Sequence, residues 1–251
     1  MSSSLIQESR HGDVLLLEFN NPGMLNALDI RMAEEIVKVL DSLDSDDTPV
    51  VVMTGTGRAF CAGGDIKLMA RGEAGVDYMH RMNGLVKAIA HSDAVIVSAV
   101  NGLAYGGGFG LVLASDIAFA ASDAKLAMVH GDIGLVPDMG SHFFLPRVTG
   151  MSTAKLLLWM GESIDSSEAL RLGIVNRVVE PEKLVSQTLE FAGRLAERPR
   201  QVLRLSKRLL AALPTMTLDD LLEGESDAQV ECFGTDDHRA RLKALLEKRK
   251  S

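Results

Sequence analysis

The sequence predicts an α/β protein, and three observations indicate this class. Short runs of β-branched and apolar residues, at residues 50–54 and 95–100, have the length and composition of buried strands. Segments with the apolar spacing of helices follow them, so strands and helices alternate through the first half of the chain. Hydrophobic residues are 47% of the 251 residues and charged residues are 24%, which is typical of a folded globular chain. We therefore expect a layered α/β core.

Each element of the first half has a local signal. The apolar run at residues 14–19 enters the turn Asn20-Asn21-Pro22-Gly23, which marks the end of a strand. Asp29 can cap the next helix, because a carboxylate accepts hydrogen bonds from the free N–H groups of a first turn. The elements predicted after it are a strand at residues 50–54, a helix at 75–90, a strand at 95–100, a short helix ending at Leu113 and a strand at 116–120.

From about Met151 the pattern becomes mostly helical. The predicted helices are at residues 153–159, 167–172, 182–195, 201–212 and 218–247, and one short strand is predicted at 174–179. We expect an α/β core over residues 1–190 and a C-terminal helical region over residues 191–251. This helical region is predicted to be a lid on the core or an assembly surface, because no low-complexity linker separates it from the rest.

Charge and composition exclude several classes of protein. The formal net charge is −8, which argues against a broad nucleic-acid surface. The two cysteines, Cys61 and Cys232, are too few for a disulfide framework, and no HExxH or zinc-type Cys/His spacing predicts a metal site. No secretory signal begins the chain, and no apolar run approaches the roughly 20 residues of a membrane span. We expect a cytoplasmic protein without a membrane partner.

Two glycine-bearing loops, residues 58–66 and 101–108, each lie between a predicted strand and a predicted helix. Glycine allows a ligand to approach the main chain closely, and the N–H groups of a first helical turn have no partners inside the helix. Two such amides can bind one oxygen atom as its negative charge develops, which is an oxyanion hole. Tight turns that only pack helix on strand remain the alternative. Neither loop has the pattern of a phosphate-binding loop or of a Rossmann dinucleotide site.

Several motifs, in order over nearly the whole chain, closely resemble the crotonase (enoyl-CoA hydratase/isomerase) family. They are Asn26-Ala27-Leu28, residues 57–66, Val100-Asn101-Gly102, Gly106-Gly107-Gly108, Ser115-Asp116-Ile117, Gly134-Leu135-Val136-Pro137, Leu145-Pro146-Arg147 and residues 168–175. The resemblance implies the crotonase fold, with repeated ββα units and two roughly perpendicular sheets. It also implies that the C-terminal helices pack homotrimers, which often pair into hexamers.

The resemblance also implies a substrate and its binding residues. The substrate is an acyl-CoA thioester, so coenzyme A belongs to the substrate and no separate cofactor is expected. The thioester oxygen is expected between the backbone amides of Gly64 and Gly107. The implied contacts to adenine and pantetheine are Leu25, Ala27, Ala62, Gly63, Asp65 and Ile66, and Tyr105 and Phe109 are expected to line the acyl pocket. Met24 stands where many members carry a lysine near the CoA phosphates.

The acidic residues distinguish the reactions within this family. The hydratases that the chain resembles use two glutamates, at positions that correspond to Gly110 and His130 here, so both carboxylates are absent. Asp138 matches the catalytic aspartate of dienoyl-CoA isomerases and of ring-epoxide phenylacetyl-CoA isomerases, and the single-Asp pattern resembles the second group more. His130 is a candidate second acid or base, because its ordinary protonation range lies near neutral pH. If the family resemblance is set aside, Asp138, which follows Pro137, is predicted to be a turn residue.

These observations predict an acyl-CoA enzyme that moves a double bond or proton in an enoyl-CoA thioester. Gly64 and Gly107 stabilise the enolate, and Asp138 carries the proton. A first alternative is an enoyl-CoA hydratase, in which Asp138 or His130 activates water. A second is a non-catalytic CoA-binding subunit that has kept the fold.

Overall fold

A computed structural model describes residues 4–43 and 47–248, and two sheets organise its core. The larger sheet has six strands in the order β1-β2-β3-β5-β7-β10, and the smaller has four in the order β4-β6-β8-β9. β1 pairs antiparallel with β2 and β9 pairs antiparallel with β8, whereas the other neighbours are parallel. The strands are β1 (Ile6–His11), β2 (Val14–Phe19), β3 (Val50–Gly55), β4 (Ala59–Cys61), β5 (Val95–Val100), β6 (Leu103–Tyr105), β7 (Ile117–Ala121), β8 (Lys125–Ala127), β9 (Ile164–Asp165) and β10 (Arg177–Val179).

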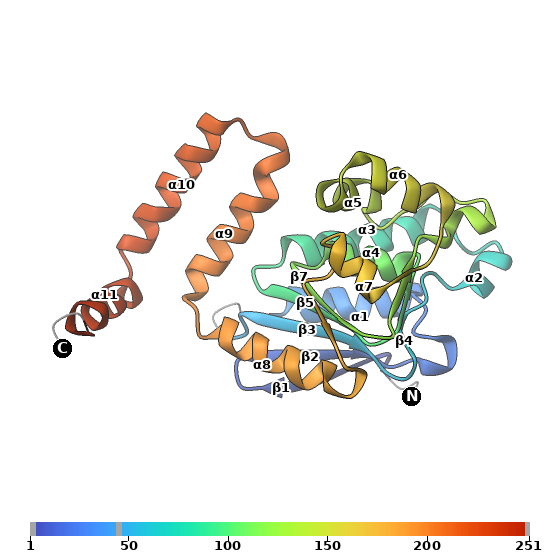
Figure 1. Ribbon diagram of the computed structural model, residues 1–251, viewed down its shortest axis with the longest axis horizontal. Coiled ribbons are helices and arrows are strands. Elements are labelled where there is room, and N and C mark those ends of the chain that lie inside the picture. The colour runs from blue at the N-terminus through green and yellow to red at the C-terminus, as the bar shows by residue number, and fades with distance from the viewer. Residues whose placement is uncertain (1–3, 44–46, 249–251) are drawn as a thin grey trace.

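Successive strand pairs repeat one arrangement. In the pairs β3–β4, β5–β6 and β7–β8, the first strand joins the larger sheet and the second joins the smaller sheet. The first pair is followed by α2 (Ile66–Ala70) and α3 (Val76–His91), and the second by α4 (Gly107–Ala114). The chain is thus a series of ββα units, and Figure 1 shows their helices packed around the sheets. The α/β class and the repeated unit agree with the sequence-based expectation.

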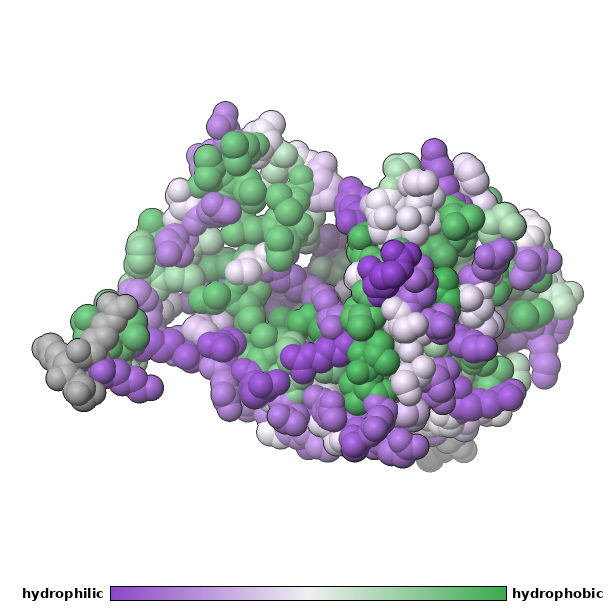
Figure 2. Space-filling view, viewed as in Figure 1, coloured by the Kyte–Doolittle hydropathy of each residue, from purple (hydrophilic) through white to green (hydrophobic). Residues whose placement is uncertain are grey.

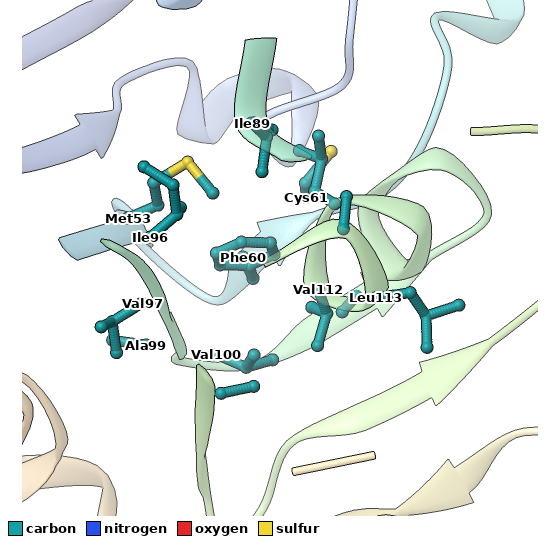
Figure 3. Close-up of a cluster of buried hydrophobic side chains, with 14 of the residues drawn as sticks. Met53, Phe60, Cys61, Ile89, Ile96, Val97, Ala99, Val100, Val112 and Leu113 are labelled. Carbon is teal, nitrogen blue, oxygen red and sulfur yellow. The ribbon is translucent and has the colours of Figure 1, made fainter. Parts of the chain in front are cut away.

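The core lies between these layers. All residues of β3 and β5 are buried, which explains why their sequences are continuous apolar runs rather than alternating ones. All residues of α4 are buried as well. Phe60 from β4 lies at the centre of the cluster in Figure 3, among side chains that include Met53, Ile96 and Val112. The segments that carry the glycine loops are therefore held from both sides by packed apolar groups.

Local signals in the sequence place several elements correctly. β2 and β5 have the predicted bounds, and α1 (Ile30–Asp41) begins at Asp29, whose side chain accepts a hydrogen bond from Met32 N at 2.7 Å. The long helix expected over residues 218–247 is wrong, because it is divided into α10 (Leu218–Phe233) and α11 (Asp236–Lys248). The break follows from Gly234 and Thr235, since Thr235 Oγ1 accepts from His238 N at 3.1 Å as a helix-initiating residue does.

The C-terminal helices divide into a packed group and an extended one. α5 (Ser141–Thr149), α6 (Met151–Met160), α7 (Ser166–Arg171) and α8 (Leu184–Ala196) lie against the core, and α8 packs on β3 and β5. We call α9 (Arg200–Ala212), α10 and α11 the C-terminal arm, because they extend away from the core in Figure 1. No helix in the described ranges has both the length and the apolar character needed to cross a bilayer.

The predicted boundary between residues 190 and 191 falls inside α8. Because α8 packs on the larger sheet, we propose that the core extends through this helix and that the helical region begins with the C-terminal arm. The outer ends of the two predicted parts, residues 1–3 and 249–251, lie outside the described residues.

Candidate functional site

The two glycine loops meet at one edge of the smaller sheet. Each loop segment includes one of two neighbouring parallel strands, β4 and β6, so the glycines that follow these strands leave the sheet at the same edge. Gly63 has a φ of +96°, and a Cβ atom there would lie 2.9 Å from Tyr105 O and 3.3 Å from Gly107 N. Only a glycine permits this close approach of the two main chains. The contact brings together residues that are more than forty positions apart in the sequence, Gly63 and Tyr105.

The amides of Gly64 and Gly107 lie in this contact region without acceptors. Leu28 N donates to Gly63 O at 2.7 Å and Asp65 N donates to Leu28 O at 3.0 Å, which leaves the intervening Gly64 N–H unused. Gly107 is the first residue of α4, so its N–H has no partner inside the helix. Within residues 4–43 and 47–248, no hydrogen-bond acceptor is found for either N–H. Two amides that are free to donate are what an oxyanion hole requires.

Asp138 and His130 form a side-chain pair beside the second loop. His130 Nε2 lies 3.1 Å from Asp138 Oδ1, so a hydrogen on Nε2 can be donated to the carboxylate. His130 is buried, whereas the Asp138 side chain keeps 29% of its surface exposed. A Cβ on Gly106 would lie 3.5 Å from His130 Cε1, which places the imidazole directly against the loop. The pair is therefore adjacent to the free Gly107 amide.

Met139 occupies the space beside Gly110. A Cβ on Gly110 would lie 2.3 Å from Met139 Cβ, which is too close for any larger side chain without movement of the Met139 backbone. Met139 is 2% exposed and has a φ of +52°, in the left-handed region that L-residues rarely adopt. The position that corresponds to the first glutamate of the hydratases is thus closed by packing as well as lacking a carboxylate.

Residues proposed to contact CoA gather around the first glycine loop. Leu25 O accepts from Ala62 N at 3.0 Å, and Asp65 caps α2 by accepting from Lys67 N at 2.8 Å. Ala27 precedes the Leu28–Gly64 bridge, and Ile66 is 65% exposed at the start of α2. These contacts bring Leu25, Ala27, Ala62, Gly63, Asp65 and Ile66 together. Their role in binding stays a prediction.

An exposed cation lies beside Met24, where many family members carry lysine. Lys67 Nζ is 3.8 Å from Met24 Sδ, which places a positive charge from α2 beside position 24.

The two aromatic residues expected in the acyl pocket have different surroundings. Tyr105 is half-buried, and its hydroxyl lies 3.2 Å from Ser163 Oγ. Phe109 is 1% exposed and packs in the hydrophobic core. Tyr105 therefore keeps a surface that a ligand can reach, whereas the surroundings of Phe109 indicate core packing.

Tyr78 is a polar residue near the site that the sequence analysis did not identify. Its hydroxyl donates to Leu28 O at 3.3 Å, and the residue is 4% exposed. Burial raises the pKa of the Tyr78 hydroxyl, and the negative charge of Asp138 raises it further. The spacing of Tyr78, Met82, Leu85 and Ile89 places Tyr78 on the buried face of α3, but this pattern alone does not point to the glycine loop.

Comparison with known proteins identifies the family and the fold of the chain. A family model described as enoyl-CoA hydratase/isomerase matches residues 9–251. The short-chain-enoyl-CoA hydratase of Clostridium acetobutylicum is 32% identical over 96% of this chain and 94% of that protein. The 1,2-epoxyphenylacetyl-CoA isomerase of Escherichia coli is 34% identical over 94% of this chain and 93% of that protein. The crystal structure of an enoyl-CoA hydratase from Polaromonas superimposes with a TM-score of 0.92 at 30% identity, over 97% of both chains.

The predicted family and fold are confirmed by these matches, which extend over nearly the whole chain. The protein therefore belongs to the enoyl-CoA hydratase/isomerase (crotonase) family, has the crotonase fold, and is an enzyme of acyl-CoA thioesters.

Proposed function

We propose that this enzyme is an enoyl-CoA isomerase in which Asp138 moves a proton between two carbons of the acyl chain. The observation that supports this most directly is the Asp138–His130 pair beside the second glycine loop, at 3.1 Å. It supplies one carboxylate, while Met139 fills the place of a second carboxylate at position 110. One carboxylate is enough for an isomerisation, since the proton removed from one carbon is returned to another.

In the proposed reaction no atom is gained or lost. Asp138 accepts a proton as a C–H bond at the α-carbon of a 3-enoyl thioester breaks, and the electron pair moves onto the thioester oxygen to give a dienolate. The Gly64 and Gly107 amides donate hydrogen bonds to that oxygen while it carries charge. The electron pair then returns to a different carbon, which takes the proton back from Asp138. The product is the isomeric enoyl-CoA.

His130 is proposed to keep Asp138 ready for this transfer. A hydrogen on Nε2 occupies Oδ1 of the carboxylate, which leaves Oδ2 to accept the substrate proton. His130 Nδ1 is buried without a hydrogen-bond partner among the described residues, so the hydrogen is better placed on Nε2, where it has an acceptor. In this arrangement His130 orients the base.

A hydratase is the alternative that the relatives favour, because several of them carry that name. The crotonyl-CoA hydratase of Syntrophomonas wolfei, for example, is 33% identical over 94% of this chain. In that reaction Asp138 or His130 activates a water molecule. The surroundings of Gly110 argue against a hydratase. Met139 leaves no room there for the glutamate that the related hydratases use.

The two reactions are separated by their effect on the enoyl chromophore. An isomerase generates the absorbance of a conjugated 2-enoyl-CoA from a 3-enoyl-CoA, whereas a hydratase removes the absorbance of crotonyl-CoA by adding water. We expect the first change without the second. Rapid loss of crotonyl-CoA absorbance would support the hydratase instead, and no turnover of enoyl, dienoyl and ring-bearing thioesters would support a non-catalytic CoA-binding subunit.

Asp138→Ala tests the base itself. We expect kcat to fall by about 10²–10⁴-fold, the range that general acid–base catalysis contributes. Asp132→Ala is the matched control, because Asp132 is an exposed carboxylate on the same segment, and it should keep full activity. Equal activity of both variants would exclude Asp138 as the base.

We also propose that the enzyme is a homo-oligomer, a trimer or a hexamer, that works in the cytoplasm without a separate cofactor. Exposed apolar side chains support the assembly: Leu210, Leu218 and Val230 on the C-terminal arm are 67%, 70% and 69% exposed. Figure 2 shows apolar residues gathered over α9 and α10. A cleft of about 1100 Å³ between α9 and the core, lined in part by Phe143, Phe144 and Leu213, adds to this apolar surface.

A further inference from the structure

The hydroxyl of Tyr78 lies against the glycine loop that carries the first proposed oxyanion donor. Tyr78 belongs to the first turn of α3, and its side chain is 4% exposed within the core. A Cβ atom on Gly64 would lie 2.7 Å from the Tyr78 hydroxyl oxygen and 3.8 Å from its Cζ. The hydroxyl therefore occupies the space that a side chain at position 64 would need.

This contact explains why position 64 is a glycine. Gly64 does not have a left-handed φ, so its backbone conformation is open to other residues. The two atoms that exclude a side chain are the Tyr78 hydroxyl and the end of the Met69 side chain, whose Cε would lie 2.5 Å from the added Cβ. The methionine end can move, but the tyrosine ring is held in the core. Gly64 and Tyr78 are thus complementary in shape.

A hydrogen bond ties the same hydroxyl to the segment that pairs with Gly64. The Tyr78 hydroxyl donates to Leu28 O at 3.3 Å, and Asp65 N donates to this carbonyl at 3.0 Å. Leu28 N in turn donates to Gly63 O at 2.7 Å. The residues on both sides of Gly64 are therefore hydrogen-bonded to Leu28. The Tyr78 hydroxyl makes a third hydrogen bond to the same residue.

From these contacts we infer that Tyr78 is a positioning residue that holds the Gly64 amide in the direction of the thioester oxygen. The inference rests on the proposed role of Gly64. Burial raises the pKa of the Tyr78 hydroxyl, with the charge of Asp138 as the next cause, so the hydroxyl remains a donor at ordinary assay pH. A misaligned amide weakens the hydrogen bond that strengthens as the oxygen gains charge, and such a loss appears in kcat rather than in KM.

Tyr78→Phe removes the hydroxyl and keeps the ring. We expect kcat to fall about tenfold while KM stays within about twofold, a smaller loss than the 10²–10³-fold typical for removing an oxyanion donor outright. Thr188→Val is the matched control, because Thr188 Oγ1 also donates from a buried hydroxyl to a main-chain carbonyl, that of Leu184 at 2.8 Å in α8. It should lose comparable stability and keep kcat.

A spectroscopic measurement separates positioning from a general loss of structure. The absorption of bound cinnamoyl-CoA shifts to longer wavelength when hydrogen bonds polarise its carbonyl. The measurement is made in the Asp138→Ala variant, because this variant lacks the proposed base and should not turn the thioester over. We expect a shift in the Asp138→Ala protein, a clearly smaller shift after adding Tyr78→Phe, and an unchanged shift after adding Thr188→Val. No shift in Asp138→Ala protein that binds the thioester would contradict the proposed oxyanion site itself. A full shift with Tyr78→Phe, together with unchanged kcat, would overturn the role of Tyr78 alone.

The close contact between position 64 and the Tyr78 hydroxyl can be tested separately. Gly64→Ala should reduce activity strongly in the wild-type background, because its methyl group meets the Tyr78 hydroxyl. In the Tyr78→Phe background the same substitution should cost several-fold less, since the hydroxyl is gone. Losses that simply multiply in the double variant would show that the two residues are not coupled, and would contradict the inference.

Discussion

The α/β core and the C-terminal arm are held in different ways. Every residue of β3, β5 and α4 is buried. By contrast, α9, α10 and α11 contain no fully buried residue up to residue 248, where the described chain ends. The central strands and α4 bury their apolar side chains within one chain, whereas the arm leaves much of its own apolar surface exposed. The catalytic groups proposed here all lie in the part that packs on itself.

A polar contact joins the arm to the core. Lys207 of α9 donates from Nζ to Asp116 Oδ2 at 2.7 Å and to Ala94 O at 2.9 Å. Burial raises the pKa of Asp116, and the positive charge of Lys207 partly lowers it again. Two regions with different packing are therefore connected through a partly buried ion pair, in addition to apolar contacts.

The largest expected effect concerns packing in the core. A Cβ on Gly108 would lie 2.0 Å from Cys61 O, a main-chain atom of a buried strand. We expect Gly108→Ala to destabilise the fold by about 3 kcal/mol or more, because the strand or α4 must move. Gly84→Ala in α3 is the control, since no atom lies within 4 Å of its added Cβ, and it should stabilise by about 0.5–1 kcal/mol. Urea unfolding measures both values.

Equal stabilities of these two alanine variants would contradict the tight packing of the core around the glycine loops. A loss of stability with Gly108→Ala but not with Gly84→Ala would support this packing.

The second prediction concerns the link between the two regions. Lys207→Met should destabilise by about 2 kcal/mol at pH 7, because it leaves the Asp116 carboxylate without its cation. The loss is smaller than for a fully buried pair, since the Asp116 side chain is 27% exposed.

The pH dependence of that loss has a definite sign. The pKa of Asp116 in the folded state lies above its ordinary value of 3.8, so its stabilising contribution is fully present below pH 3.8 and is lost as pH rises through the folded-state pKa. Without Lys207 this pKa rises further. The destabilisation by Lys207→Met should therefore shrink as pH falls from 7 toward 4, in the difference of unfolding free energies. In the Asp116→Asn background, Lys207→Met should show little of this dependence. A loss that stays constant with pH would indicate that Lys207 acts through its carbonyl contacts instead.

The smallest effect on stability is expected in the arm. Val230→Asp places a charge on an exposed position of α10 and should change the unfolding free energy of the isolated chain by less than about 0.5 kcal/mol. If the arm packs on a second copy, the same variant should lower the molecular mass measured by light scattering. Asp219→Asn, at another exposed position of α10, should leave the mass unchanged. An unchanged mass with Val230→Asp would remove Val230 from the proposed assembly surface.

Local patterns predicted those elements that have a continuous apolar run or a clear capping residue. The apolar runs of β2 and β5 marked both ends of each strand, and Asp29 marked the start of α1. Short elements with weaker patterns were not predicted, such as the exposed strand β1 and the helix α5, which contains Pro146. β1 carries mostly polar residues, and its strand conformation depends on pairing with β2. Its register is therefore a property of the sheet and not of its own sequence.

The features of the site also divide into those with a local sequence pattern and those that depend on contacts between distant segments. The sequence alone was enough to predict the family and its acyl-CoA substrate class, because the motifs that carry the resemblance follow one another in order along the chain. It also led to the prediction that Asp138 is the base. Which groups meet depends on the folded chain, in which His130 lies against Asp138, Met139 fills the space at Gly110, and Tyr78 of α3 contacts Gly64. Contacts of this kind arise from side chains far apart in sequence that share one packed volume, and a linear pattern does not record them.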